Sequence, residues 1–209
     1  TGFNNTVNLA GALTQTNAAT GATTFGNTVN VGSADLKGTT FALNNSFASG
    51  GTTAVTNSGL LTKNATGAVT STGAFSTTGA ASLAANVTTT DADLTIGGAL
   101  TLAEAATVTL STGAGTAGNI LLSGAADGTG GGVAETLTLQ AGTGSATFGG
   151  ALGTGDALKL NAVTLTNAAA TGFNNTVNLA GALTQTNAAT GATTFGNTVN
   201  VGSADLKGT

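Results

Sequence analysis

The sequence predicts an all-β protein built as a parallel β-helix, in which short strands and tight turns stack coil upon coil. Three observations lead to this prediction. A long segment of the chain occurs twice without a change, apolar residues alternate with Thr at a period of two, and Thr, Gly and Asn dominate a composition with only 6% charged residues. Together they indicate a β-solenoid with about eight coils in each repeat.

Residues 1–39 recur unchanged at 171–209, so one repeat spans residues 1–170. We expect residues 1–170 to form one full β-solenoid repeat, and residues 171–209 to begin the next, identical repeat as a continuous solenoid without a linker. The chain opens on Thr without a signal peptide and stops inside the second copy, which indicates a window cut from a longer array. An engineered or accidental duplication is the alternative interpretation.

Phe3, Phe25 and Phe47 are evenly spaced, at a shorter period of about 22 residues that suits a solenoid. The first two open the similar phrases FNNTVNL and FGNTVNV, and further alternating segments are 94–96, 100–102, 108–110, 137–139, 158–160 and 163–165. Alternation of this kind is typical of strands with one buried face, and the Gly, Asn, Asp and Ser residues between the runs suit tight turns. We therefore expect short strands and no helix, since Thr, Gly and Asn are poor helix formers.

Three strands of about five residues and three short turns occupy roughly 22 residues, which is one coil. The repeat at 1–170 then holds about eight coils and rises ~38 Å at ~4.8 Å per coil. Leu, Val, Phe and Ile make up only 44 of the 209 residues, so Ala, Thr and Gly must fill the rest of the interior. We expect hydrogen bonds and side-chain stacks between coils to stabilise this fold more than its thin core does.

Missing residue types exclude several classes of function. His and Cys are absent, which rules out an imidazole base, a thiol nucleophile, the usual zinc sites and a disulfide. The four basic residues are all Lys and the net charge is −4, so the chain lacks the basic surface that nucleic acids require. Low charge without Pro argues against disorder, and no apolar run approaches the roughly 18 residues of a membrane helix.

The acidic residues are the remaining candidates for chemistry: Asp35, Asp91, Asp93, Glu104, Asp127, Glu135, Asp156 and Asp205. Asp91 and Asp93 would share a face if their segment were extended, and paired carboxylates can bind Ca²⁺ or transfer protons. A β-helical polysaccharide lyase would also need an Arg or Lys base beside its Ca²⁺ ligands, and the chain has no Arg. Solvated turn acids are the favoured interpretation.

Glycine-rich segments resemble binding loops only superficially. Residues 113–118 and 128–132 lack the Lys and the following helix of a phosphate-binding loop. Residues 150–158, GALGTGDAL, are a single degenerate copy of a calcium-binding repeat. We therefore predict no catalytic, cofactor-binding or metal-binding residue, no cofactor and no enzymatic activity.

Thr-x-Thr pairs raise the alternative of an ice-binding solenoid, in which Thr side chains form a flat rank. The pairs stand at residues 14/16, 70/72, 107/109, 136/138 and 164/166. Successive pairs are unevenly spaced and do not recur once in every predicted coil, so we expect solvent-facing filler and no continuous rank.

Two further residue types are assigned structural roles. We expect the aromatic residues to stack in the core rather than to form adhesive contacts: Phe3, Phe25, Phe47, Phe75 and Phe148. Acceptor sequences for N-linked sugar occur at Asn4, Asn44, Asn64, Asn86 and Asn174. A composition so rich in Asn and Thr produces such sequences by chance, and we assign no glycosylation.

Three phrases carry a family resemblance: TFGNTVNVGSADLKG at 24–38, DLTIGGALTLAEAATVTLSTGAGTAGNILLSGAADG at 93–128 and ETLTLQAGTGSATFGGALG at 135–153. They resemble the β-strand repeats of very large secreted bacterial surface proteins, the filamentous-haemagglutinin-like and autotransporter-type adhesins. The resemblance covers essentially the whole chain and implies a right-handed parallel β-helix exported to the cell surface as a shaft or adhesive fibre. The near-identity of the repeats departs from the diverged coils of many such proteins, which favours a uniform filament.

The leading hypothesis is therefore a repeat segment of an extracellular bacterial surface fibre, a stiff shaft for adhesion, cell–cell contact or coating. A glycan- or surface-binding adhesin module that acts through its polar faces is the alternative, and an ice-binding solenoid ranks below it. The expected partners are copies of the chain end to end, or the rest of a long tandem-repeat chain, together with cell-surface glycans. No nucleic acid and no membrane span are expected, and the expected location is the cell surface.

Overall fold

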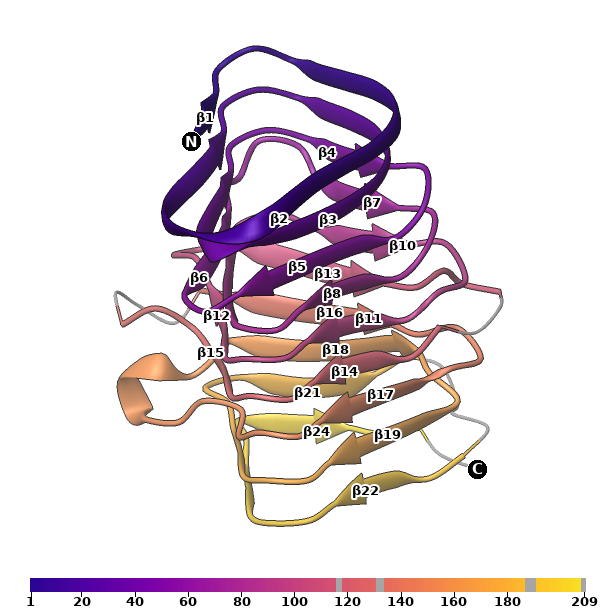
Figure 1. Ribbon diagram of the computed structural model, residues 1–209. Helices are drawn as coiled ribbons and strands as arrows, with labels where there is room; N and C mark the ends of the chain where they lie inside the picture. The colour runs from indigo at the N-terminus through magenta and orange to yellow at the C-terminus, as the bar shows by residue number, and fades with distance from the viewer. Residues whose placement is uncertain (116–117, 131–133, 187–190, 208–209) are drawn as a thin grey trace.

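A computed structural model of the chain describes residues 1–115, 118–130, 134–186 and 191–207. These residues form one stack of coils, and each coil runs along three faces before it returns to the first face one strand further along the axis (Figure 1). Every strand pairing among them is parallel. The stack has about 9 turns, which confirms the predicted all-β parallel solenoid, and the only described helix is the short 3₁₀ segment η1 (Asp156–Leu158).

The three faces are defined by their strands. Face 1 holds residues 7–9 of β2 (Val7–Phe25), residues 29–31 of β3 (Val29–Leu43), β4 (Phe47–Ser49), β7 (Val69–Ser71), β10 (Val87–Thr89), β13 (Thr107–Ser111), β16 (Thr136–Gln140), β18 (Ala162–Asn167), β21 (Ala182–Gln185) and β24 (Ser203–Asp205). Face 2 holds residues 12–15 of β2, residues 33–38 of β3, β5 (Thr53–Asn57), β8 (Phe75–Thr77), β11 (Leu94–Ile96), β14 (Ile120–Leu122), β17 (Ser145–Phe148), β19 (Ala170–Phe173) and β22 (Thr193–Phe195). Face 3 holds β1 (Gly2–Phe3), residues 22–25 of β2, residues 40–43 of β3, β6 (Leu60–Lys63), β9 (Ala80–Leu83), β12 (Leu100–Leu102), β15 (Ala126–Asp127), β20 (Val177–Asn178) and β23 (Val199–Asn200).

The strands form because alternate residues point into the shared interior. In β12, Leu100 and Leu102 are buried while Thr101 between them is partly exposed. Small polar residues complete the interior at the corner between faces 1 and 2, and here they are Ser rather than the Ala, Thr and Gly that the composition suggested. Ser49 and Ser71 are buried there, and their hydroxyls donate to the carbonyl oxygen of Gly51 at 3.0 and 2.7 Å. These bonds satisfy a turn carbonyl that water reaches poorly.

Asn side chains bond to the backbone at several corners. The side-chain oxygen of Asn27 accepts the backbone N–H of Thr28 at 2.8 Å, and Asn197 accepts that of Thr198 at the same distance. Asn45 and Asn175 accept from the next residue in the same way. A side chain that bonds the neighbouring backbone competes with regular pairing and turns the chain.

A column of glycines lets the coils approach closely between faces 2 and 3. A Cβ added to Gly98 would lie 2.5 Å from the carbonyl carbon of Gly79, one added to Gly124 would lie 2.6 Å from that of Gly98, and one added to Gly150 would lie 2.3 Å from that of Gly124. Real Cβ contacts are longer, so each coil needs a residue without a side chain here.

The coils differ in length, although the sequence suggested one regular short period. Along face 1 the paired residues are Val7, Val29, Phe47, Val69, Val87, Leu110, Leu139 and Leu165. The coil from Val29 to Phe47 is therefore among the shortest, and the coil from Leu110 to Leu139 is the longest of this series. Phe47 consequently pairs with Val29 on face 1, whereas Phe3 and Phe25 pair on face 3. The spacing of these three Phe residues does not mark a single column.

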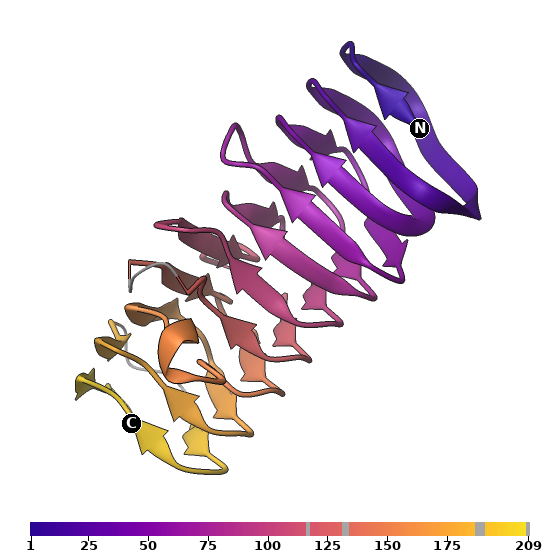
Figure 2. The ribbon, with the colours of Figure 1, turned by 90° about the vertical axis from the view of Figure 1, so that its left-hand side faces the viewer.

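The stack has its N-terminal and C-terminal coils at opposite ends (Figure 2). Strand β19 begins at Ala170, the last residue of the first repeat, and continues into the second copy. The boundary between the two copies therefore lies inside a strand.

Candidate functional site

The candidate carboxylate pair does not share a strand face. Asp91 lies in a bend with φ of +54°, and strand β11 begins only after Asp93. The extended segment on which a shared face depended is therefore absent, and both acids are exposed beside this bend, in agreement with the favoured interpretation as turn acids. Asp93 instead accepts the backbone N–H of Asn119 at 2.8 Å and its side-chain amide at 3.2 Å. Asn119 in turn accepts the N–H of Ser145 at 3.0 Å, which links three successive coils.

Other acids also take up structural contacts. Asp35 lies 3.4 Å from the Lys37 ammonium, and its copy Asp205 lies 3.8 Å from that of Lys207. Both pairs are partly exposed and contribute little to stability. Over the described parts of the chain, no three acids lie close enough together to hold a metal ion.

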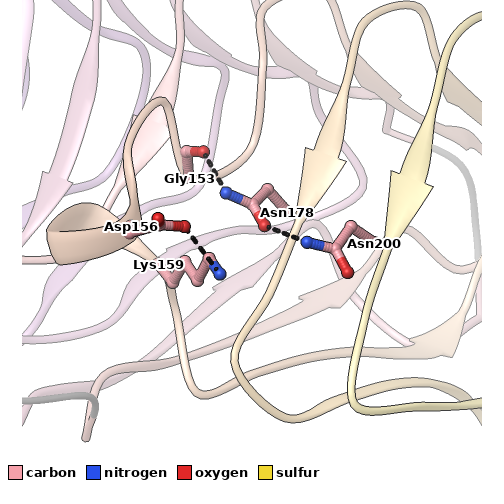
Figure 3. A network of polar contacts seen from close by, with 5 residues as sticks. All are labelled: Gly153, Asp156, Lys159, Asn178 and Asn200. Atoms are coloured by element: carbon pink, nitrogen blue, oxygen red, sulfur yellow. Dashed lines mark hydrogen bonds and ion pairs between the residues drawn. The ribbon is translucent and has the colours of Figure 1, made fainter.

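Residues 150–158 lead into the excursion that protrudes from face 3, on the left of Figure 1. Asp156 in η1 forms an ion pair with Lys159 at 2.9 Å, and this hydrogen bond and charge hold the pKa of the Asp156 carboxyl below its ordinary value. Beside it the Asn178 amide donates to the carbonyl oxygen of Gly153 at 3.2 Å and accepts from Asn200 at 3.0 Å (Figure 3). The hydrogen bond between Asn178 and Gly153 attaches this loop to the next coil.

The preceding coil holds a buried acid at the corner between faces 3 and 1. Glu135 is fully buried and accepts the Thr129 hydroxyl at 2.6 Å and the backbone N–H groups of Thr129 and Ala134, both at 3.3 Å. Burial alone would raise its pKa, but these hydrogen bonds outweigh burial and lower the pKa of the Glu135 carboxyl. Of the two glycine-rich segments, residues 116–117 and 131–132 lie outside the described part of the chain, so neither loop is described in full.

A buried cation is the least expected group. Lys63 is 1% exposed and stands in a column of face 3 between Leu43 and Leu83. Its ammonium donates to the carbonyl oxygens of Asn64 at 2.6 Å and Thr66 at 2.9 Å. Burial lowers the pKa of this amine. The alternation of buried residues was the signal that could have located both charges. Lys63 follows Leu61 at a spacing of two, and Glu135 precedes Leu137 at the same spacing.

A continuous rank of Thr residues runs along the C-terminal half of face 1, contrary to our expectation. Thr109 pairs with Thr138, Thr138 with Thr164, and Thr164 with Thr184. We call these four residues the Thr rank. A second column begins beside it with Thr107 and Thr136, whose hydroxyls lie 3.1 Å apart. The spacings in sequence misled the prediction because the coils here are unequal in length.

The aromatic residues lie in the core, as predicted. Phe25, Phe47, Phe75 and Phe148 are each 1% exposed, and Phe3 is partly buried. Two of the sugar-acceptor residues are bonded to each other across coils, since the Asn64 amide donates to Asn44 at 2.8 Å. Asn86 accepts the N–H of Thr109 at 2.8 Å.

The N-terminal coil encloses a hollow of about 360 Å³. Its lining residues are Thr1, Phe3, Leu13, Thr14, Gln15, Thr16, Phe25 and Leu36. The copies of Leu13 and Gln15 in the second repeat, Leu183 and Gln185, are at most 3% exposed because another coil covers them. The hollow is therefore an uncovered end of the interior rather than a ligand pocket.

The class that this fold defines is the parallel β-solenoid, and the described part of its surface carries the Thr rank. No family model matches the chain, and comparison with curated proteins and with solved structures likewise found no match. Within the described residues, no helix has the length and apolar character needed to cross a membrane.

Proposed function

We propose that this chain is a structural segment of an extracellular bacterial surface fibre, in which it acts as a stiff rod. The observation that carries this proposal is the continuity of parallel pairing across the boundary between the two copies. Face 2 pairs without a break from Ser145–Phe148 through Ala170–Phe173 to Thr193–Phe195. A chain with more copies would therefore extend the same rod, and the proposed partners are those further copies.

The stiffness has a physical basis in the contacts between coils. Backbone hydrogen bonds join neighbouring coils at the corners as well as along the strands, as in Gly50 to Val31 and Gly97 to Thr77, at 2.9 and 2.8 Å. Bending the rod would break several of these bonds in one coil at once. The chain has only four Lys residues, and Lys63 is buried, which leaves few sites for proteases that cleave after Lys.

The location at the cell surface rests on the resemblance of the LTL and TFGG phrases to bacterial surface fibres. An antibody against the chain tests it on intact cells that produce the protein. We expect labelling of intact cells, and loss of that label after brief treatment of the cells with a protease. Label that appears only after the cells are lysed would contradict the proposal.

A surface-binding role is the second candidate, and the Thr rank favours it. Four hydroxyl-bearing side chains at strand spacing form a regular row, next to the bonded pair Thr107 and Thr136. Such a row could match hydroxyls of a glycan or the surface of ice. The glycan is the proposed partner, and ice is the less favoured one.

A matched pair of variants separates binding from a purely structural role. Thr138→Leu interrupts the Thr rank, whereas Thr95→Leu changes a similarly exposed Thr on face 2. If the rank binds, only Thr138→Leu should weaken retention on immobilised cell-surface polysaccharide, or the thermal hysteresis of freezing solutions. Equal behaviour of both variants and the parent chain in both assays leaves the rod as the sole function.

A further inference from the structure

The two copies of the repeated segment occupy different faces of the solenoid, although they are identical in sequence. Phe3 pairs with Phe25, and Phe25 pairs with Leu43, on face 3. The copy of Phe3 is Phe173, which pairs with Phe148 and Phe195 on face 2. The same residue of the repeat therefore lies on two different faces of the solenoid, one in each copy.

The other two strands of the segment shift in the same sense. Val7 lies on face 1, whereas its copy Val177 lies on face 3, where it pairs with Leu152 and Val199. The strand around Leu13 moves from face 2 to face 1, because the copy Leu183 pairs with Val163. All three strands are displaced by one face, so the displacement belongs to the whole segment.

Counting coils along one column gives the size of the displacement. From Thr23 on face 3, seven successive partners lead to Val177 on the same face: Phe41, Leu61, Ala81, Leu100, Ala126, Leu152 and Val177. The chain then passes along face 1 and reaches Thr193, the copy of Thr23, on face 2. The two copies are thus separated by seven full coils and two further faces.

Two local features of the segment are the same in both copies, although the single strand β2 (Val7–Phe25) of the first copy is divided into β20, β21 and β22 in the second. The rings of Phe3 and Phe25 stack at 5.0 Å with an interplanar angle of 6°, and those of Phe173 and Phe195 stack at 5.1 Å and 3°. The Asn corner is likewise preserved. It joins faces 3 and 1 at Asn27, and faces 2 and 3 at Asn197, with the same 2.8 Å hydrogen bond.

We infer that each repeat advances the solenoid by seven and two-thirds coils, so that consecutive repeats present identical surface residues on different faces in turn. This inference rests on the proposed function, because it concerns a fibre of such repeats. The axial step per repeat is then ~37 Å, and only three repeats, ~110 Å, restore the starting orientation. A partner that recognises one surface, such as the Thr rank, meets it in three directions around the rod.

Pairs of introduced cysteines test the displacement within this chain, which has no Cys of its own. Thr147→Cys with Gly172→Cys should cross-link on mild oxidation, since these residues are partners on face 2. A Cβ at Gly172 would lie 4.0 Å from the Thr147 methyl group and makes no close contact. If the second copy stood on the same faces as the first, Gly172 would lie on face 3, as Gly2 does, and would not be the partner of Thr147 on face 2.

Asn178→Cys with Asn200→Cys is the positive control, because these two residues pair in either arrangement, as Asn8 and Asn30 do. We expect both the control and the Thr147–Gly172 pair to cross-link. Failure of the Thr147–Gly172 pair when the control succeeds would overturn the inference.

Averaged images of a chain with several repeats test the same inference in the fibre. We expect a step of ~37 Å combined with a rotation by one face, added to any gradual twist of the solenoid. A step of ~38 Å without such rotation would overturn it. The cysteine result does not depend on where the fibre is located, so a failure of the proposed surface location leaves this inference intact and the two outcomes can be told apart.

Discussion

The ammonium of Lys63 lies 2.9 Å from the carbonyl oxygen of Thr66, inside a column whose neighbouring members are Leu43 and Leu83. Its side chain is 1% exposed. The corner residues Asn64 and Thr66 are exposed, so water can replace the amine at their carbonyl groups. The cation therefore occupies a position that holds Leu in the two neighbouring coils, at a cost in desolvation that its hydrogen bonds only partly offset.

We predict that Lys63→Leu raises the free energy of unfolding at neutral pH by on the order of 1 kcal/mol. Burial lowers the pKa of Lys63 from its ordinary 10.5, so the unfolded chain binds a proton more tightly than the folded chain does. Stability should therefore rise as the pH increases from the lowered pKa toward 10.5. Urea unfolding followed by circular dichroism should show this alkaline rise in the parent chain and not in Lys63→Leu. The partly exposed control Lys37→Leu should keep it.

The buried Glu135 should produce its own dependence at acid pH. Its pKa is lowered in the folded state by hydrogen bonds that outweigh burial, so its contribution is complete above the unfolded pKa and is lost as the pH falls through the folded pKa. We expect Glu135→Gln to lower the free energy of unfolding by about 1–3 kcal/mol at neutral pH, and by less in acid. Glu104→Gln, at an exposed turn, is the control. An equal loss at all pH values would contradict this account.

The glycine column should not accept even one methyl group. Gly124→Ala would place a Cβ 2.6 Å from the backbone of Gly98, and the coils would have to separate, at a cost of about 1–3 kcal/mol. Gly155→Ala meets nothing within 4 Å and has an extended backbone with φ of −151°, so it should be neutral. Thermal unfolding of both variants distinguishes crowding from a general effect of replacing Gly.

Phe3 and Phe173 are copies of one residue of the repeat, so a comparison of the two measures how much a covering coil contributes to stability. Phe173 is stacked between Phe148 and Phe195, at 4.8 and 5.1 Å, whereas Phe3 is stacked on Phe25 and is only partly buried. We expect Phe173→Ala to destabilise the protein by about 3–5 kcal/mol, and Phe3→Ala by clearly less. Similar unfolding midpoints for the two variants would show that the second ring contact adds nothing.

Alternation and repetition were sufficient to predict the fold. The phrases LTI, LTL and TLTLQ became strands β11, β12 and β16, with their Leu and Ile side chains buried. The expectation that Thr helps to complete a thin interior was also confirmed, for example at Thr53 and Thr77, whereas the buried Ser71 was not predicted. These features are local, because a period of two and a turn residue determine them within a few positions.

The predictions that failed depended on the number of residues in each coil. The Thr rank could not be recognised from sequence spacings, because Thr109, Thr138 and Thr164 belong to coils of unequal length. For the same reason Phe47 was not assigned to its face. An excursion at a corner changes the number of residues in a coil but leaves the strand pairing unchanged. No local sequence pattern indicates how many residues belong to such an excursion. The Asp91–Asp93 segment shows another limit of the sequence, because a shared face required an extended segment and only the structure shows the bend there.

Unequal coils have a further consequence for how such a rod can vary. The short coil from Val29 to Phe47 and the long coil from Leu110 to Leu139 each add one strand to the stack, so mass and length are uncoupled. An insertion at a corner makes the rod wider at one level and leaves its reach unaltered. The length of the rod therefore depends on the number of stacked strands and not on how many residues are inserted at its corners.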